Sequence, residues 1–244
     1  YIFGMLFLKR MSDVFAEKQR EIRRKFGRLG EPRVTVLLDD RSAYGDTFFV
    51  PPHARWYDAF TDANGVAQPA IKDMHDNIGE RLNKALALLE ENNPGLEGVL
   101  KHIDFNATIN NKRKVSDRQL EDLIAHFSQP QYVLVNNNFE FPDLLGAAYE
   151  YLIKYFADSA GKKGGQFYTP PQVVRLMVQL LRPAEGMSIY DPTAGSGGML
   201  IQSNQWVEEQ GGNGRNLMLH GQEKDGTVVS ICKMNLILHN ILDA

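Results

Sequence analysis

Hydrophobic residues at helical spacing dominate the start of the chain. Along residues 2–27 the apolar positions fall near a period of 3.6 residues, which predicts one amphipathic helix. Gly27 and Gly30 lie near its end, as is usual where a helix stops. Residues 31–70 show no clear period and are expected to form irregular loops around short elements.

Three further apolar stripes predict helices in the first part of the chain. The first stripe runs from near Met74 to near Asn92, the second covers residues 120–127 and the third covers residues 144–156. Ser116 and Gln119 have the spacing of a capping box in front of the second stripe. The first 158 residues are therefore expected to form a mostly helical domain.

The pattern changes at residues 158–165, where small, polar and glycine residues indicate a loop. We place a domain boundary there, so that the expected domains are 1–158 and 159–244. Thr169 is expected to cap a helix whose first turn holds Pro170 and Pro171. The elements expected after this helix are a strand at 187–191, a helix from 197 to 206 or beyond, a strand at 217–221 and a helix at 227–242. Alternating strands and helices predict an α/β fold with a parallel, doubly wound sheet.

Composition is that of a globular protein: of 244 residues, 43% are apolar and 23% charged, with a net charge of −3. The single cysteine, Cys232, cannot form an internal disulfide, which favours a reducing, cytoplasmic location. The longest apolar run, residues 1–8, is too short to cross a bilayer, so no membrane association is expected. The chain lacks an initiator methionine and stops directly after an expected helix, so we expect it to be part of a longer protein.

Basic residues gather in two segments of this mildly acidic chain, Arg10–Arg28 and Lys101–Arg118. Residues 1–30 carry eight basic against three acidic residues, and residues 101–118 carry five against two. Such segments can contact phosphates, although a solvated charged face is the simpler interpretation. Charge reversal at Lys112, Arg113 and Lys114 tests the second segment.

The most informative stretch is a glycine-rich turn between a predicted strand and a predicted helix. The strand ends at Asp191, and Gly195, Gly197 and Gly198 follow. Ligands of open α/β sheets bind beyond the carboxyl ends of the strands, and free helix N–H groups can hold a carboxylate. A dinucleotide fingerprint needs a third glycine at position 200, which is Leu200. An acid inside the loop suits a ligand with an ammonium group, such as S-adenosylmethionine, better than a pyrophosphate; a plain tight turn stays open as an alternative.

Glu223 follows the second predicted strand. An acid at this position commonly accepts hydrogen bonds from ribose hydroxyls, although a solvated loop acid is the alternative. The sequence has no Cys/His cluster with the spacing of a metal site, so no metal is expected.

In three motifs the sequence resembles the modification (M) subunits of type I restriction–modification systems, an adenine-specific DNA methyltransferase family. The motifs are Gly-Gly-Gln-Phe-Tyr-Thr-Pro-Pro at 164–171, Asp-Pro-Thr-Ala-Gly-Ser-Gly-Gly at 191–198 and Gly-Gln-Glu-Lys at 221–224. Segments 1–9, 144–152 and 234–239 are similar to the family as well. The likeness is thin through residues 31–135.

The resemblance implies a Rossmann-like, S-adenosylmethionine-dependent methyltransferase domain after a helical domain. Asp191 would face the ammonium group of the cofactor, and Glu223 would bind its ribose. The remaining cofactor-binding residues that the resemblance implies are Gln166, Phe167, Tyr168, Thr169, Pro170, Pro171, Gly195, Ser196, Gly197 and Gly198. The partners implied are double-stranded DNA, a specificity subunit and a restriction (motor and nuclease) subunit, with the first domain contacting DNA and the specificity subunit.

The sequence departs from the family in one motif. These methyltransferases carry an Asn-Pro-Pro-aromatic loop that holds the flipped adenine, and no Asn-Pro-Pro occurs here. We therefore expect a cofactor half-site without catalytic residues in this span, which is inactive by itself.

Two other functions stay open at this point. The chain would be a non-catalytic scaffold if Tyr1, Phe3 and Phe7 formed an interface for a partner helix. It would act on RNA or protein if the methyl acceptor were not DNA, because only the resemblance selects DNA.

Overall fold

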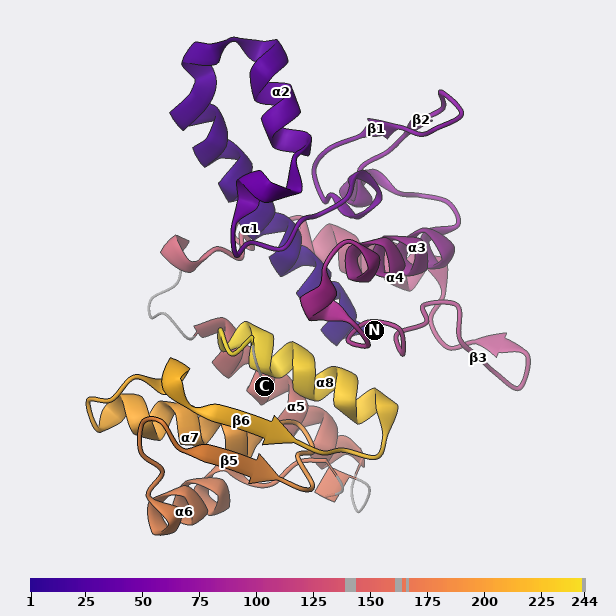
Figure 1. Cartoon of the computed structure of the whole chain (residues 1–244). Helices are drawn as coiled ribbons and strands as arrows, with labels where there is room; N and C mark the ends of the chain where they lie inside the picture. Colours follow the sequence, from indigo (N-terminus) through magenta and orange to yellow (C-terminus); the bar gives the residue numbers. More distant parts are fainter. Residues whose placement is uncertain (139–143, 161–163, 166, 243–244) are drawn as a thin grey trace. The chain divides into compact units, whose positions relative to one another are not determined.

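The computed structural model describes residues 1–138, 144–160, 164–165 and 167–242. The chain forms two compact units, Tyr1–Phe139 and Glu140–Ala244 (Figure 1).

Helix α1 (Ile2–Phe26) confirms the first predicted helix, and its apolar residues are largely buried. Phe7 has no exposed surface, and Tyr1 packs against Phe105 with 5.8 Å between ring centroids. The burial of Phe7 does not favour the scaffold hypothesis at that residue.

Helix α2 (Glu31–Asp39) corrects the expectation of irregular structure after residue 31. It packs against α1 as the second arm of a helical hairpin (Figure 1). Only Val34 and Leu38 are buried along it, and this two-residue stripe is too short to show a period in the sequence. The rest of the loop prediction holds, since short 3-10 turns and the two-residue strands β1 (Phe60–Thr61) and β2 (Ala67–Gln68) follow.

The middle of the first unit holds α3 (Ile78–Glu91), the antiparallel hairpin β3 (Thr108–Ile109) and β4 (Lys112–Arg113), and α4 (Asp117–Phe127). Helix α3 begins four residues later than expected, because Met74 ends a separate 3-10 turn. The capping box of α4 is confirmed: the Ser116 hydroxyl accepts from the Gln119 amide, and the Gln119 side chain accepts from the Ser116 amide.

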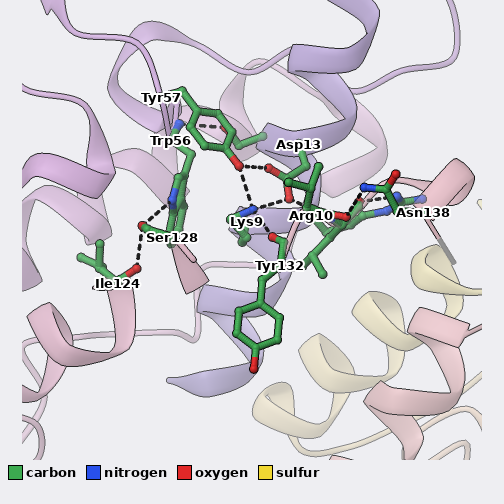
Figure 2. A network of polar contacts seen from close by, with 12 residues as sticks. Lys9, Arg10, Asp13, Trp56, Tyr57, Ile124, Ser128, Tyr132 and Asn138 are labelled. Atoms are coloured by element: carbon green, nitrogen blue, oxygen red, sulfur yellow. Dashed lines mark hydrogen bonds and ion pairs between the residues drawn. The ribbon is translucent and has the colours of Figure 1, made fainter. Parts of the chain in front are cut away.

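A buried ionic network holds α1 in this unit (Figure 2). The Lys9 ammonium pairs with Asp13 one turn along the helix and also donates to the Tyr57 hydroxyl (2.9 Å) and the Tyr132 carbonyl (2.7 Å). Asp13 in turn accepts from the Tyr57 hydroxyl (2.6 Å) and the Leu134 amide (2.7 Å). Burial lowers the pKa of Lys9, and the Asp13 charge partly offsets this effect.

Arg10 extends the same network. Its guanidinium donates to the Leu134 carbonyl (2.5 Å) and to the Asn136 side chain (2.6 Å). Arg10 is only 9% exposed, so it is committed to internal contacts. The basic segment that begins at Arg10 therefore presents its outward charge from later residues.

The second unit has the strand and helix order that the sequence predicts. Its elements are α5 (Leu144–Ala160), α6 (Pro171–Leu181), β5 (Ser188–Asp191), α7 (Gly198–Glu209), β6 (Met218–Gly221) and α8 (Gly226–Leu238). Strands β5 and β6 are parallel, with Ser188 opposite Met218 and Asp191 opposite Gly221 (Figure 1). Their carboxyl ends consequently lie at one edge, where the sequence places the glycine loop.

A hydrophobic core joins the strands and helices of the second unit. Ile189 and Leu219, from the two strands, join a core with Leu200 of α7 and Leu236 of α8. Helix α6 packs against α7, and α5 packs against α8. A stripe on α6 is exposed, and its residues are Val173, Leu176, Met177, Leu180 and Leu181.

Three boundaries differ from expectation. Helix α5 packs on α8, so the compact units divide at Phe139/Glu140 and not near residue 158. Thr169 does not cap α6, because the helix begins at Pro171 with Pro170 as its N-cap residue. Helix α8 ends at Leu238, and Asn240 after it has a positive φ of 60°, which ends helical geometry.

Candidate functional site

The loop between β5 and α7 is shaped by its own backbone. The Asp191 carboxylate, at the end of β5, accepts from the Thr193 amide (3.0 Å). Gly195 and Gly197 have positive φ values of 54° and 86°, a region that side chains with a Cβ rarely adopt. Gly197 is the N-cap of α7, so the turn delivers the first amides of that helix to the end of the strand.

The Phe167 segment is fastened directly to this loop. The Ser196 amide donates to the Phe167 carbonyl (2.9 Å). A Cβ at Gly195 would lie 2.8 Å from the same carbonyl oxygen, closer than real contacts allow. Two motifs about 30 residues apart in the sequence therefore form one surface, and glycine at 195 is required for their approach.

Glu223 braces the loop from the β6 side. One carboxylate oxygen accepts from the Gly195 amide (3.1 Å), and the other accepts from the amides of Lys224 (2.7 Å) and Asp225 (3.0 Å). The Ala194 amide donates to the Gln222 carbonyl (2.9 Å) beside it. The loop is thus held by both strands' ends.

A cavity of about 420 Å³ opens where the two motifs meet. Eight of the expected cofactor residues line it: Phe167, Tyr168, Thr169, Pro171, Asp191, Gly195, Ser196 and Gly198. Pro170, Gly197 and Glu223 are outside the lining, and Gln166 is outside the described residues. A Cβ at Gly198 would meet only open space, so this glycine keeps the cavity wide beside the helix start.

Helix α5 supplies a wall that the sequence reasoning missed. Ala147, Glu150, Tyr151 and Lys154 all line the cavity. They lie three or four residues apart, opposite the buried stripe that includes Tyr149. Their shared face was visible in the sequence, but nothing in it indicated that this face meets the glycine loop.

Charges of both signs surround the cavity. Glu150 and Asp191 bring carboxylates, Lys154 brings an ammonium group, and the α7 N-terminus brings backbone N–H groups. Burial, together with the Glu150 and Asp158 charges, raises the pKa of Tyr168, so its phenol stays protonated and can donate a hydrogen bond. The arrangement suits a zwitterionic ligand with an apolar body.

Residues of α8 support the loop from below. The buried Asn235 side chain donates to the Ser196 carbonyl (2.9 Å). A Cβ at Gly197 would lie 3.0 Å from the Cys232 sulfur. Burial raises the pKa of the Cys232 thiol to about 12, helped by the Asp191 and Glu223 charges, so Cys232 packs here as a neutral side chain.

The described residues show neither a metal-binding cluster nor a membrane-spanning helix. No group of three or more His, Cys, Asp or Glu side chains there has the arrangement of a metal site. Among the same residues, no helix combines the length and the hydropathy that a membrane span needs.

Comparison with known proteins gives a consistent result for both units. The profile of the HsdM N-terminal domain family matches residues 1–127, and that of the N-6 DNA Methylase family matches residues 140–244. The chain belongs to the modification-subunit family of type I restriction–modification systems.

The chain is similar to curated type I methylase subunits of two microbes. It is 31% identical to the type I restriction enzyme HindI methylase subunit of Haemophilus influenzae, over 79% of this chain and 43% of the relative. It is 29% identical to the MjaIX methylase subunit of Methanocaldococcus jannaschii, over 97% of this chain and 41% of the relative. The chain thus spans less than half the length of these relatives.

A solved structure supports the fold. The type I restriction-modification system methyltransferase subunit from Streptococcus thermophilus superposes with a TM-score of 0.61 at 22% identity, covering 98% of this chain and 50% of that one. The expected fold class, a helical unit followed by the first part of an α/β methyltransferase unit, is confirmed. The separate boundary of the N-6 DNA Methylase match at residue 140 agrees with the compact units described above.

Proposed function

We propose that the second unit binds S-adenosylmethionine in the cavity between the glycine loop and α5. The observation that carries the proposal is the convergence of the Phe167 and Asp191 motifs on one cavity of about 420 Å³, within the usual size of ligand pockets. When bound, the cofactor supplies an electrophilic methyl group on its sulfonium.

Each cofactor group has a suitable partner among the lining residues. Asp191 and Glu150 offer carboxylates to the ammonium group, while Lys154 and the first amides of α7 offer donors to the carboxylate. Glu223 is kept as the proposed ribose acceptor, because its carboxylate bonds to the Gly195 amide at the cavity edge. Phe167 and Tyr168 supply apolar surface and a hydroxyl donor beside the same cavity. Gln166, Thr169, Pro170 and Pro171 complete the proposed cofactor segment.

We further propose that the whole subunit methylates the exocyclic amine of adenine in double-stranded DNA. A specificity subunit would select the site, a restriction subunit would join the assembly, and the first unit would contact DNA and the specificity subunit. Relatives named as type I methylase subunits support this proposal. The sequence lacks an Asn-Pro-Pro loop, so we expect this span alone to bind cofactor without methylating DNA. A cytoplasmic location fits a free cysteine.

Calorimetric titration of the chain with S-adenosylmethionine tests the cofactor proposal. We expect saturable binding of S-adenosylmethionine, no binding of NAD, and a loss of about tenfold or more in affinity for Asp191→Asn, which removes one charge opposite the ammonium group. Glu209→Gln, on the far end of α7, is the matched control and keeps wild-type affinity. Saturable binding of NAD, or no binding of S-adenosylmethionine, would contradict the proposal.

A further inference from the structure

The β3–β4 hairpin is an exposed basic feature of the first unit. Residues 108–114 are all exposed, and Asn110 and Asn111 form its tight turn with φ values of 50° and 60°. The hairpin stands out at the side of its unit in Figure 1. Its run Lys112-Arg113-Lys114 supplies three of the five basic residues in the segment 101–118.

Strand alternation divides these three basic residues between two faces. Thr108 pairs with Arg113 and Ile109 pairs with Lys112, and the Lys114 amide donates to the Ala107 carbonyl (2.9 Å). Since successive side chains of a strand point to opposite faces, Ile109, Lys112 and Lys114 share one face and Arg113 is on the other.

Arg113 is committed to the base of the hairpin. It forms an ion pair with Asp117 (3.0 Å) and donates to the Asn106 side chain (2.5 Å). Asn106 and the Arg113 guanidinium both approach Gly79, at the start of α3, where a Cβ would come within 2.5 Å of each. The face that carries Arg113 is therefore turned toward its own unit.

The acidic residues of the segment are also used internally. Asp104 accepts from the Asn83 side chain (2.7 Å) and from the Asn106 amide (2.8 Å), while Asp117 pairs with Arg113. The opposite face is left with Lys112 in β4 and Lys114 directly after it, about 6.8 Å apart at the usual extended rise of about 3.4 Å per residue. Beside them the Ile109 side chain is 57% exposed.

We infer that this face of the hairpin, Ile109, Lys112 and Lys114, binds the sugar–phosphate backbone of duplex DNA. The two lysines contact phosphates, and Ile109 packs on the sugar edge of the groove. A two-stranded ribbon with outward lysines is complementary in charge and width to a DNA groove. The inference rests on the proposed DNA substrate, and it assigns a sequence-independent contact between the first unit and DNA to this hairpin.

Fluorescence anisotropy with a labelled DNA duplex, measured with the whole chain over a range of salt concentrations, tests the inference. Lys112→Gln/Lys114→Gln removes two phosphate contacts, so the slope of log affinity against log salt falls by about 1.8 and affinity at low salt falls by about tenfold or more. Ile109→Ser weakens binding without changing the slope, because no counterion is involved. Lys72→Gln/Lys84→Gln, an equal change of charge at exposed lysines elsewhere in the unit, is the control and keeps the wild-type slope.

The outcomes separate this inference from the proposed function. If the wild-type chain binds duplex DNA and the hairpin variant has the same affinity and slope, the hairpin assignment is wrong and the DNA substrate stands. Equal losses of DNA affinity in the hairpin and control variants overturn the assignment too, because they would show that only the net charge of the chain determines binding. No binding of duplex DNA at low salt, or a preference for duplex RNA, overturns both; titration with S-adenosylmethionine then tests the cofactor site independently.

Discussion

Gly195→Ala tests whether the two cofactor motifs depend on one close backbone approach. The new Cβ lies 2.8 Å from the Phe167 carbonyl oxygen, so one of the two segments moves by about half an ångström to reach ordinary contact. The shift breaks the hydrogen bond from the Ser196 amide to Phe167, worth about 1 kcal/mol. The positive φ of 54° adds about 1–2 kcal/mol for a residue with a Cβ.

Together these terms amount to about 2–3 kcal/mol at the cavity wall. When this energetic cost falls on the conformation that binds the cofactor, the affinity for S-adenosylmethionine falls by about 30- to 150-fold. Calorimetric titration measures this loss directly, and circular dichroism confirms that the variant is folded.

Gly186→Ala provides the matched control. Gly186 has a positive φ of 82° and no atom within 4 Å of a Cβ, and it lies outside the cavity lining. The control variant therefore has backbone strain without the collision, and we expect wild-type affinity from it. Wild-type affinity in Gly195→Ala, or an equal loss in both variants, would refute the reasoning that the approach to Phe167 shapes the site.

Three further predictions concern stability and reactivity. Lys9→Met leaves Asp13 buried without its cation, and we expect it to lower the free energy of unfolding by about 3–5 kcal/mol in urea titration. The double variant Lys9→Met/Asp13→Leu should lose less stability than the sum of the two single variants, by more than about 1 kcal/mol. Strict additivity of the losses would contradict a coupled pair. Because burial raises the pKa of Cys232 to about 12 from 9.0, the stability that this thiol contributes is fully present below pH 9 and is lost as the pH rises toward 12. Cys232→Ala should flatten this decline of the free energy of unfolding at alkaline pH. Rapid alkylation of the native thiol at pH 8 would contradict its burial. Arg113→Gln removes a half-exposed ion pair and should cost less than about 1 kcal/mol in thermal unfolding, whereas a large loss would mean that the hairpin base supports the whole unit.

The local pattern of the sequence determined most helices and both strands of the α/β unit. The long apolar stripe of α1, the capping box of α4 and the strand–glycine–helix order around Asp191 each depend on residues near one another in the chain. Local hydrogen bonding and side-chain periodicity are sufficient for such elements. Helix α2 was missed because two buried residues make no measurable period.

Tertiary structure decided which of these elements meet. Only the folded chain places Glu150 and Lys154 of α5 on the same cavity as the glycine loop, and only packing against α8 assigns α5 to the second unit. It also decided which charges are available, since Lys9 and Arg10 bond inside the first unit although the sequence counts both among the basic residues of 1–30. Contacts between residues distant in the chain depend on which helix and strand faces pack against one another. A single sequence indicates which face of each element is apolar, but not which other element that face will contact.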